Sequence, residues 1–237
     1  MMETIRSQED VLVMLDSLLQ EQSKFNWDSF YSDRKRPVPF FVQAPDENLV
    51  KYLQNNILGI GGKALELGAG PGRNAIYLAQ QGYEVDAVDL SSEAIQWGKE
   101  RAQEQNVSVH FMQKNIFELE VEEEEYDLIY DSGCFHHIAP HRRLNYVDLI
   151  SKALKPNGYF GITCFVENGL LGGSDQSDWE VYRQLSLRGG LGYNPEKLTN
   201  IFKDLVLIEI RQMQEIEQPS DLFGSSGLWT ALFQKKN

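Results

Sequence analysis

From residue 63 onward the chain alternates short apolar runs with longer amphipathic stretches. The apolar runs predict strands over Ala64–Leu67, Glu84–Asp89, Val107–Met112, Tyr126–Asp131 and Tyr159–Phe165. The stretches between them predict helices over Arg73–Gln81, Ser92–Gln105 and Pro140–Leu154. Strands and helices that alternate in this way form βαβ units, whose right-handed crossovers return the chain to one parallel sheet. The pattern therefore predicts an α/β fold.

Two more strands are expected near the C-terminus, over Leu205–Met213 and Leu228–Gln234. A short helix precedes them, with Asn194 as its cap and Pro195 at its first position. Lys155–Gly158 is a strong turn signal before the fifth strand. The sheet is thus expected to have seven strands.

The N-terminal part of the chain has a different pattern. Ser7 and Asp10 have the spacing of a capping box, and apolar residues then recur at helical spacing up to Leu19. An aromatic and basic stretch follows over Phe25–Phe41, where prolines exclude one regular element, and a second helix is expected from Asp46.

These patterns suggest a division of the chain. We predict an N-terminal helical cap or lid over residues 1–58 and a main domain over residues 59–237. Residues 166–193 are rich in glycine and polar residues, and we interpret them as a lid insertion rather than as part of the sheet.

Composition and charge narrow the function classes. With 237 residues the chain fits one α/β domain, and its net charge of −13 opposes binding to a phosphate backbone. No apolar run approaches the roughly 18 residues of a membrane span. Cys134 and Cys164 lack CxxC spacing, so no disulfide framework or thiolate zinc site is indicated. We expect a cytoplasmic protein, a monomer or homodimer, without nucleic-acid or membrane partners.

A glycine-rich turn follows the first predicted strand. Gly68, Gly70 and Gly72 let the backbone turn sharply and approach a ligand closely, and the next helix begins at Arg73 with its free N–H groups directed at that ligand. In open α/β sheets such ligands bind beyond the carboxyl ends of the strands. The turn therefore predicts a cofactor cleft, although glycines also make ordinary strand-to-helix turns.

Asp89 makes this prediction more specific. It closes the second predicted strand about 20 residues after the glycine turn, where a carboxylate accepts hydrogen bonds from ribose hydroxyls. The alternative is that Asp89 caps the helix that begins near Ser92. The dinucleotide-binding fingerprint has Gly or Ala at the position where this chain has Arg73. A nicotinamide-linked oxidoreductase is therefore the weaker hypothesis.

The glycine turn resembles the E/D-x-G-x-G-x-G motif of class I S-adenosylmethionine-dependent methyltransferases, with Glu66 and the three glycines in register. Residues Gly72–Ala79 and Gly82–Asp89 are similar to the tellurite-resistance and thiopurine methyltransferase branch. The resemblance implies a doubly wound, Rossmann-like sheet of seven strands, mostly parallel with the last strand antiparallel, and helices on both faces. It also implies direct methyl transfer from S-adenosylmethionine to a small-molecule acceptor, with S-adenosylhomocysteine as product.

The same resemblance implies roles for individual residues. The motif residue Glu66 would belong to the cofactor site, and the turn residues Gly68, Ala69, Gly70 and Gly72 would line the methionine part of the cofactor. Asp89 would hold the ribose and Leu90 would pack on the adenine. Members of the family often place an acidic residue where this chain has Asn115 and Ile116, so here the Asn115 carbonyl is expected to accept the adenine amino group.

The segment after the fourth strand is expected to meet the methyl group. Asp131 opens it as a cofactor or catalytic residue, and His136 or His137 is a candidate base because imidazole titrates near neutral pH. The alternative is that both histidines only orient the loop. The segment lacks the [D/N]-P-P-[Y/F] pattern of amino-group methylating relatives. No metal site is expected, because Pro140 interrupts the register that would join His137 to His141.

Aromatic residues outside the main domain pattern are candidates for a lid over the acceptor. We expect Trp27, Tyr31, Phe40 and Trp179 to exclude water and to contact the sulfonium through cation–π attraction, or else to serve as plain packing residues. The acceptor cannot be identified from this chain, because lid contents vary freely on a common fold. A module that binds the cofactor without turnover is the second hypothesis.

Overall fold

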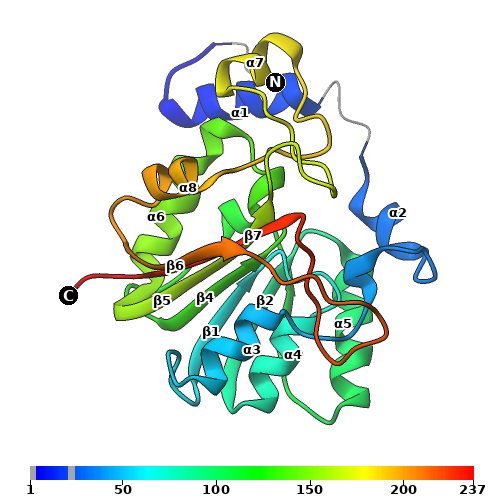
Figure 1. Cartoon of the computed structure of the whole chain (residues 1–237). Helices are drawn as coiled ribbons and strands as arrows, with labels where there is room; N and C mark the ends of the chain where they lie inside the picture. The colour runs from blue at the N-terminus through cyan, green and yellow to red at the C-terminus, as the bar shows by residue number, and fades with distance from the viewer. Residues whose placement is uncertain (1–3, 21–24) are drawn as a thin grey trace.

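One sheet organises the molecule, and it has the seven strands that the sequence predicts. The computed structural model describes residues 4–20 and 25–237. The strands are β1 (Gly62–Leu67), β2 (Tyr83–Asp89), β3 (His110–Gln113), β4 (Tyr126–Ser132), β5 (Leu154–Phe165), β6 (Val206–Gln212) and β7 (Leu228–Gln234). Their order in the sheet is β3-β2-β1-β4-β5-β7-β6, and only β7 runs antiparallel to its neighbours (Figure 1). The predicted fold class is confirmed.

Helices cover both faces of the sheet. The α-helices are α1 (Gln8–Gln20), α2 (Trp27–Ser32), α3 (Glu47–Gln54), α4 (Arg73–Gln80), α5 (Ser92–Glu104), α6 (Arg143–Ala153), α7 (Asp178–Gln184) and α8 (Pro195–Ile201). Short 3-10 turns lie at η1 (Pro39–Phe41), η2 (Ile116–Glu118), η3 (Phe135–His137) and η4 (Pro140–Arg142). Apolar side chains of α3, α4 and α5 form one core against the sheet, and those of α6 and α8 belong to the core on the other face.

The register of the central strands brings the predicted functional segments to one edge of the sheet. Leu67 at the end of β1 lies opposite Val88 of β2 and opposite Asp131 of β4. The glycine turn, Asp89 and the segment after β4 therefore leave the sheet side by side. This edge is where a parallel sheet of this type binds its ligands.

Two element boundaries differ from the sequence prediction. The third strand begins at His110 and not at Val107, because Asn106 takes a left-handed conformation and the Val107 N–H still bonds to the Ala102 carbonyl at the end of α5. The helix expected from Pro140 is divided into η4 and α6, and the fifth strand already begins at Leu154.

The expected turn at Lys155–Gly158 lies inside β5 instead of before it. Asn157 has a φ of 63°, and the pairing of β4 with β5 shifts register between Tyr126 and Leu128. The turn residues are thus accommodated as an irregularity at the start of a longer strand.

The N-terminal helix and the insertion meet above the sheet. Asp16 of α1 accepts a hydrogen bond from His141 Nε2 at 2.8 Å, and His141 Nδ1 lies 2.8 Å from the Tyr182 hydroxyl of α7. Arg142 also bonds to Asp16 and to Glu9. Figure 1 shows α1 and α7 next to each other at the top of the molecule. His141 therefore lies between α1 and α7 and not with His136 and His137. The boundaries of the cap and the lid stay predictions.

Within residues 4–20 and 25–237, no helix combines the length and apolar character needed to cross a membrane.

Candidate active site

The glycine turn after β1 has the backbone that its sequence predicts. Gly68, Gly70 and Gly72 all have positive φ, at 65°, 54° and 75°. A Cβ on Gly68 would lie 2.4 Å from the Cys134 Cβ, closer than real side chains approach one another. The glycine thus lets the first turn pack directly against the segment after β4, and it joins the predicted cofactor turn to the predicted catalytic loop.

Gly68→Ala should lower the free energy of unfolding by about 3 kcal/mol or more, since a left-handed non-glycine residue and a steric overlap both cost energy. Thermal unfolding measures the change. Gly59→Ala is the matched control, because nothing lies within 4 Å of its Cβ position, and we expect a negligible effect there. Equal unfolding temperatures for the two variants would contradict the contact.

Asp89 ties the end of β2 to the glycine turn. Its Oδ2 accepts a hydrogen bond from the Gly70 N–H at 2.8 Å, and its Oδ1 accepts one from the Ser91 N–H at 2.8 Å. Burial raises the pKa of the Asp89 carboxyl group, and the backbone hydrogen bonds from Ser91 and Gly70 act in the opposite direction. The cap of α5 is Ser91, whose hydroxyl accepts the Ala94 N–H, so Asp89 itself does not cap that helix. Each carboxylate oxygen retains a lone-pair site for a further donor.

Glu66 is a buried carboxyl group two residues before Gly68. Burial raises its pKa to about 8, while the Arg73 guanidinium and a hydrogen bond from Asn74 act in the opposite direction. Its Oε2 has no hydrogen-bond partner in the part of the chain that the structure describes. A buried carboxylate oxygen without a donor fits a cationic group of a ligand, because such an atom is costly to leave unpaired.

Arg73 connects the N-terminal segment to β4, a role that the sequence analysis missed. Its guanidinium forms an ion pair with buried Asp46, and its Nη2 donates to the Ser132 hydroxyl at 2.9 Å. Asn74 continues the contact, because its Oδ1 accepts the Asp46 N–H at 2.9 Å. The sequence feature that could have indicated this role is the polar pair Arg73-Asn74 in the first turn of α4, a helix whose other core-facing residues are apolar.

Asp131 holds the loop that follows β4. It is fully buried, and its Oδ1 accepts the N–H groups of Cys134 and Phe135 at 2.9 and 3.3 Å. Its Oδ2 accepts the Tyr146 hydroxyl at 2.6 Å, and burial raises its pKa to about 6. Because both oxygens of Asp131 already accept hydrogen bonds from the protein, the geometry favours a positioning role for Asp131 over contact with the acceptor.

The two candidate histidines have different surroundings. His136 is buried, its ring stacks on Phe165 with centroids 3.6 Å apart, and its Nδ1 accepts the Phe165 N–H at 3.3 Å. Burial lowers its pKa well below the usual value. His137 is partly exposed, lies edge-on to Trp27 at 4.9 Å and hydrogen-bonds the backbone of Gly189. Burial lowers its pKa to about 4, so it is neutral at physiological pH.

The four predicted lid aromatics are not all at the site. Trp27 contacts His137, and the Tyr31 hydroxyl lies 3.0 Å from the Cβ position of Gly70. Phe40 instead stacks on Phe30 and lies edge-on to Phe41. Trp179 is 76% exposed on α7 and has no ring contact among the described aromatics. The geometry thus brings only α2 over the cofactor turn.

A contact that the sequence did not suggest holds α2 in this place. Asp28 accepts the Ser91 hydroxyl at 2.6 Å and the Glu93 N–H at 3.3 Å, at the first turn of α5. These bonds lower the pKa of Asp28. The helix α2 is thereby held beside the end of β2, where Asp89 lies.

The residues expected at the adenine lie around the next strand ends. Leu90 directly follows Asp89 and is 58% exposed, which leaves an apolar surface free for a flat ring. Asn115 begins η2 and accepts the Phe117 N–H through its Oδ1 at 3.1 Å, while Ile116 is buried. The Asn115 oxygen is therefore already shared with the backbone, and its second lone pair is what an adenine amino group would use.

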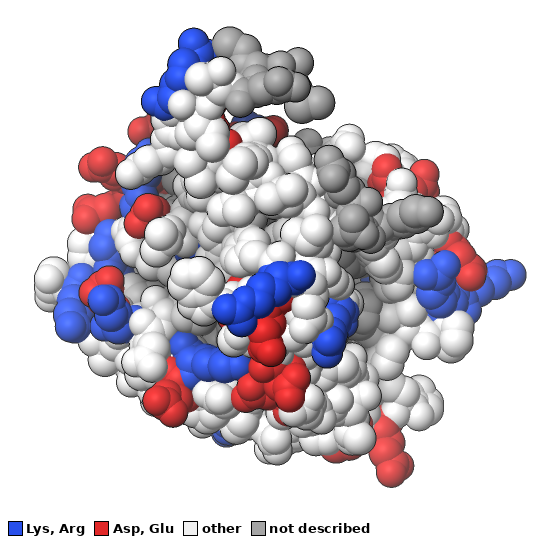
Figure 2. All heavy atoms as spheres, turned by 90° about the horizontal axis from the view of Figure 1, so that it is seen from above, with Lys and Arg blue, Asp and Glu red and all other residues white. Residues whose placement is uncertain are grey.

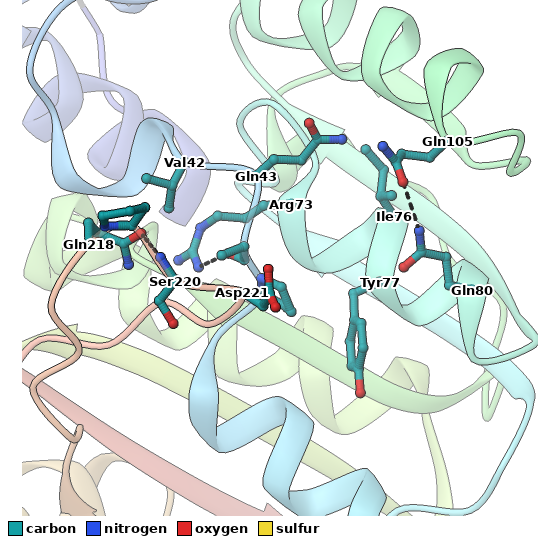
Figure 3. A pocket seen from close by; sticks show the side chains of 13 residues that line it. Val42, Gln43, Arg73, Ile76, Tyr77, Gln80, Gln105, Gln218, Ser220 and Asp221 are labelled. Atoms are coloured by element: carbon teal, nitrogen blue, oxygen red, sulfur yellow. Dashed lines mark hydrogen bonds between the residues drawn. The ribbon is translucent and has the colours of Figure 1, made fainter.

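A separate pocket of about 530 Å³ lies beyond Arg73, away from the residues assigned to the cofactor. It is enclosed by the segment 42–45, by one face of α4 and by the loop 218–221 (Figure 3). Arg73 contacts its wall through a 3.3 Å bond to the Ala44 carbonyl, and Gln80 bonds to Gln105 at its rim. We assign no cofactor to this pocket, because the glycine turn, Asp89 and the loop after β4 do not line it.

Comparisons with known proteins agree with the fold. A family model described as a methyltransferase domain matches residues 64–158. An uncharacterized methyltransferase of Schizosaccharomyces pombe is 28% identical over 135 residues, which are 56% of this chain and 91% of that protein.

Solved structures share the fold at low identity. The 1,6-didemethyltoxoflavin N1-methyltransferase of Burkholderia thailandensis, with bound 1,6-didemethyltoxoflavin and S-adenosylhomocysteine, has a TM-score of 0.64 and 20% identity over 100% of this chain and 94% of its own. TehB from Haemophilus influenzae has a TM-score of 0.60 and 19% identity over 80% and 62%. At this identity they support the fold and not a particular branch.

The described residues fit S-adenosylmethionine. The unpartnered Glu66 oxygen, the close-packed glycine turn and the Asp89 carboxylate lie at the edge where a parallel sheet of this type binds its ligands. Neither a nicotinamide-linked oxidoreductase nor a module without turnover finds support in these matches. Residues 64–158 of this chain match the methyltransferase-domain family, and the chain shares the fold of S-adenosylmethionine-dependent methyltransferases, whose cofactor the residues around the glycine turn fit.

Proposed function

We propose that this methyltransferase acts on a small-molecule acceptor that binds between the loop after β4, the helix α2 and the insertion 166–193. The observation that carries the proposal is the position of His137. Its neutral, partly exposed ring lies between Trp27 of α2 and Gly189 of the insertion, and its loop packs on Gly68 of the cofactor turn.

The cofactor would be held by the edge of the sheet around β1 and β2. Glu66 and the glycine turn would bind its methionine part, with Glu66 facing the ammonium, Asp89 would bind the ribose and Leu90 the adenine. When bound, S-adenosylmethionine supplies a methyl group on a sulfonium, which has an excellent leaving group. The protein therefore has mainly to align the acceptor and to receive its proton.

Within this proposal His136 and His137 have separate roles. His136 Nδ1 accepts the Phe165 N–H, so this buried ring fixes the loop against β5. His137 is unprotonated at neutral pH and stands at the surface of the loop, so it accepts the proton that the acceptor loses. Asp131 positions the loop through its bonds to Cys134 and Phe135.

A small acceptor is supported by several features. The loop after β4 lacks the [D/N]-P-P-[Y/F] pattern, and the Burkholderia thailandensis neighbour has 1,6-didemethyltoxoflavin bound. The net charge is −13, and Figure 2 shows Lys and Arg side chains next to Asp and Glu on the face above the sheet. We also propose a cytoplasmic location, because Cys134 and Cys164 are unbridged.

His137→Ala should lower kcat about 10- to 100-fold for an acceptor that loses a proton, because a positioned base typically contributes at least this much. The KM for S-adenosylmethionine should change little. The measurement is formation of S-adenosylhomocysteine with a panel of thiol, phenol and amine acceptors, which also identifies the acceptor class.

His136→Gln is the companion variant, since it removes the ring that stacks on Phe165. We expect it to lower the unfolding temperature as well as kcat. If His137→Ala keeps a kcat within twofold of the wild type, the ring only orients the loop and the base assignment is wrong.

A further inference from the structure

The ring of His136 has one bonded nitrogen and one free nitrogen. Burial lowers the pKa of His136, so the ring is neutral and carries a single proton. Its Nδ1 accepts the Phe165 N–H at 3.3 Å and therefore holds a lone pair, which places the proton on Nε2. This Nε2–H has no partner in the described part of the chain, although only 3% of His136 is exposed. A donor so far from bulk water is costly to leave unpaired, so a ligand is expected to supply the acceptor.

Two glycines border the edge of the ring that carries Nε2. A Cβ on Gly133 would lie 3.6 Å from His136 Cε1, and a Cβ on Gly190 would lie 3.2 Å from His136 Cδ2. Because Nε2 is bonded to both of these carbons, it lies between the loop after β4 and the insertion. The Leu191 N–H donates to the His136 carbonyl at 2.7 Å, which fixes the insertion against this loop. The free N–H is thus at the place where the acceptor is proposed to bind.

His137 presents the opposite kind of group. Burial lowers the pKa of His137 to about 4, and a hydrogen bond with the backbone of Gly189 acts in the opposite direction. A backbone group that raises the pKa of an imidazole is a carbonyl that accepts a ring N–H. One nitrogen of the neutral ring is therefore the donor to Gly189, and the other keeps its lone pair. The two histidines together offer one free donor and one free acceptor, on rings whose centroids are 4.3 Å apart.

We propose that His136 binds the acceptor directly, and that the acceptor carries two neighbouring groups. One is an acidic O–H, S–H or N–H, which His137 deprotonates, and the other is an oxygen or nitrogen lone pair, which accepts the His136 Nε2–H. Because the two rings are adjacent, both groups must lie close together, as on adjacent positions of one aromatic ring. This inference rests on the proposed function and adds the class of acceptor to it.

The two histidines divide the work of the transfer. The acceptor loses its proton to the free nitrogen of His137, and the electron pair that this proton leaves behind forms the bond to the methyl carbon. The electron pair of the broken sulfur–methyl bond stays on sulfur. His136 exchanges no proton, because its Nε2–H only holds the neighbouring atom and thereby turns the reacting atom toward the methyl group.

Kinetics with pairs of isomers test the proposal. Catechol and hydroquinone carry their two hydroxyls on adjacent or on opposite ring positions, and 2-aminothiophenol and 4-aminothiophenol do the same with a thiol and an amine. Only the adjacent isomer can contact both histidines. We expect its kcat/KM with the wild type to be at least tenfold higher than that of the opposite isomer, because a site built around a hydrogen bond rejects a molecule that cannot make it.

His136→Asn separates the contact with the acceptor from the contact within the loop. The asparagine oxygen can still accept the Phe165 N–H, but no group reaches the position of Nε2. The preference for the adjacent isomer should fall to within about twofold. The matched control is His110→Asn on β3, because His110 has a side chain that is 68% exposed and bound to Asp86. It should keep the preference, and circular dichroism verifies that both variants are folded.

NMR of the imidazole nitrogens gives a readout that needs no turnover. At neutral pH we expect the proton of His136 on Nε2, and its signal should shift when an adjacent isomer binds. A proton on Nδ1, an equal kcat/KM for both isomers, or a preference that His136→Asn keeps overturns this inference alone. A wild type that methylates no thiol, phenol or amine overturns the proposed function as well.

Discussion

Asp89→Ala should weaken the binding of S-adenosylmethionine by about a hundredfold. Without the carboxylate, the ribose would lose up to two hydrogen bonds, each worth about 1.5–3 kcal/mol when the acceptor is charged. Loss of one such bond alone should weaken the binding of S-adenosylmethionine at least tenfold. The variant also removes the bond from Gly70 N–H that shapes the glycine turn. Isothermal titration calorimetry with S-adenosylmethionine and with S-adenosylhomocysteine measures the change.

Asp86→Ala separates ribose binding from general damage to β2. Asp86 lies three residues earlier in the same strand, and its carboxylate accepts bonds from Tyr126 and His110 at 2.8 and 2.7 Å. Its loss should lower the unfolding temperature but leave the cofactor affinity unchanged. A cofactor affinity that Asp89→Ala leaves at the wild-type value would remove the ribose assignment.

Glu66→Gln should have two opposite effects, a more stable protein and a weaker cofactor complex. The pKa of this carboxyl group is raised from 4.5 to about 8 because it is buried. Folding at neutral pH therefore forces a proton onto Glu66 that the unfolded chain does not hold. Glutamine has the same shape without this cost, and the gain at pH 7 should be on the order of 3 kcal/mol.

The sign of the effect gives a pH test. Because the pKa of Glu66 is raised in the folded state, its contribution to the free energy of unfolding is fully present below about pH 4.5. This contribution is lost as the pH rises toward 8. The difference in free energy of unfolding between Glu66→Gln and the wild type should thus be near zero at acidic pH, grow through this window and stay level above it. Urea unfolding at a series of pH values measures it.

Cofactor binding gives the second readout for Glu66. If this carboxylate faces the ammonium of the methionine part, binding at pH 7 should release close to one proton from the wild type and none from Glu66→Gln. Calorimetry in two buffers of different ionisation enthalpy counts the protons. The variant should bind the cofactor about tenfold more weakly. An affinity equal to that of the wild type, with the same proton count, would place Glu66 outside the cofactor site.

The fold was accessible from the sequence because its signals are local. The apolar runs and the turns between them marked all seven strands, and the glycine turn could be placed because three glycines within five residues need positive φ. Boundaries such as the start of β3 were missed, because Val107 has strand-like residues around it but its N–H is used to close α5.

The parts of the site that the sequence did not reveal depend on contacts between distant residues. The ion pair of Arg73 with Asp46 and the bond of Asp28 to Ser91 join positions that no local pattern relates. The same holds for the difference between His136 and His137, which are neighbours in the chain. Only the packing of Phe165 and Trp27 around them separates a buried ring from an accessible one.

The contacts that hold α1 have a consequence for the synthesis of the chain. Asp16 bonds to His141, 125 positions later, and His141 in turn lies against Tyr182. At synthesis rates of about 5 to 20 residues per second, the ribosome needs roughly 6 to 25 seconds to deliver the first of these partners. The helix α1 is therefore made well before His141 and Tyr182, and it cannot make these contacts until both have been synthesised.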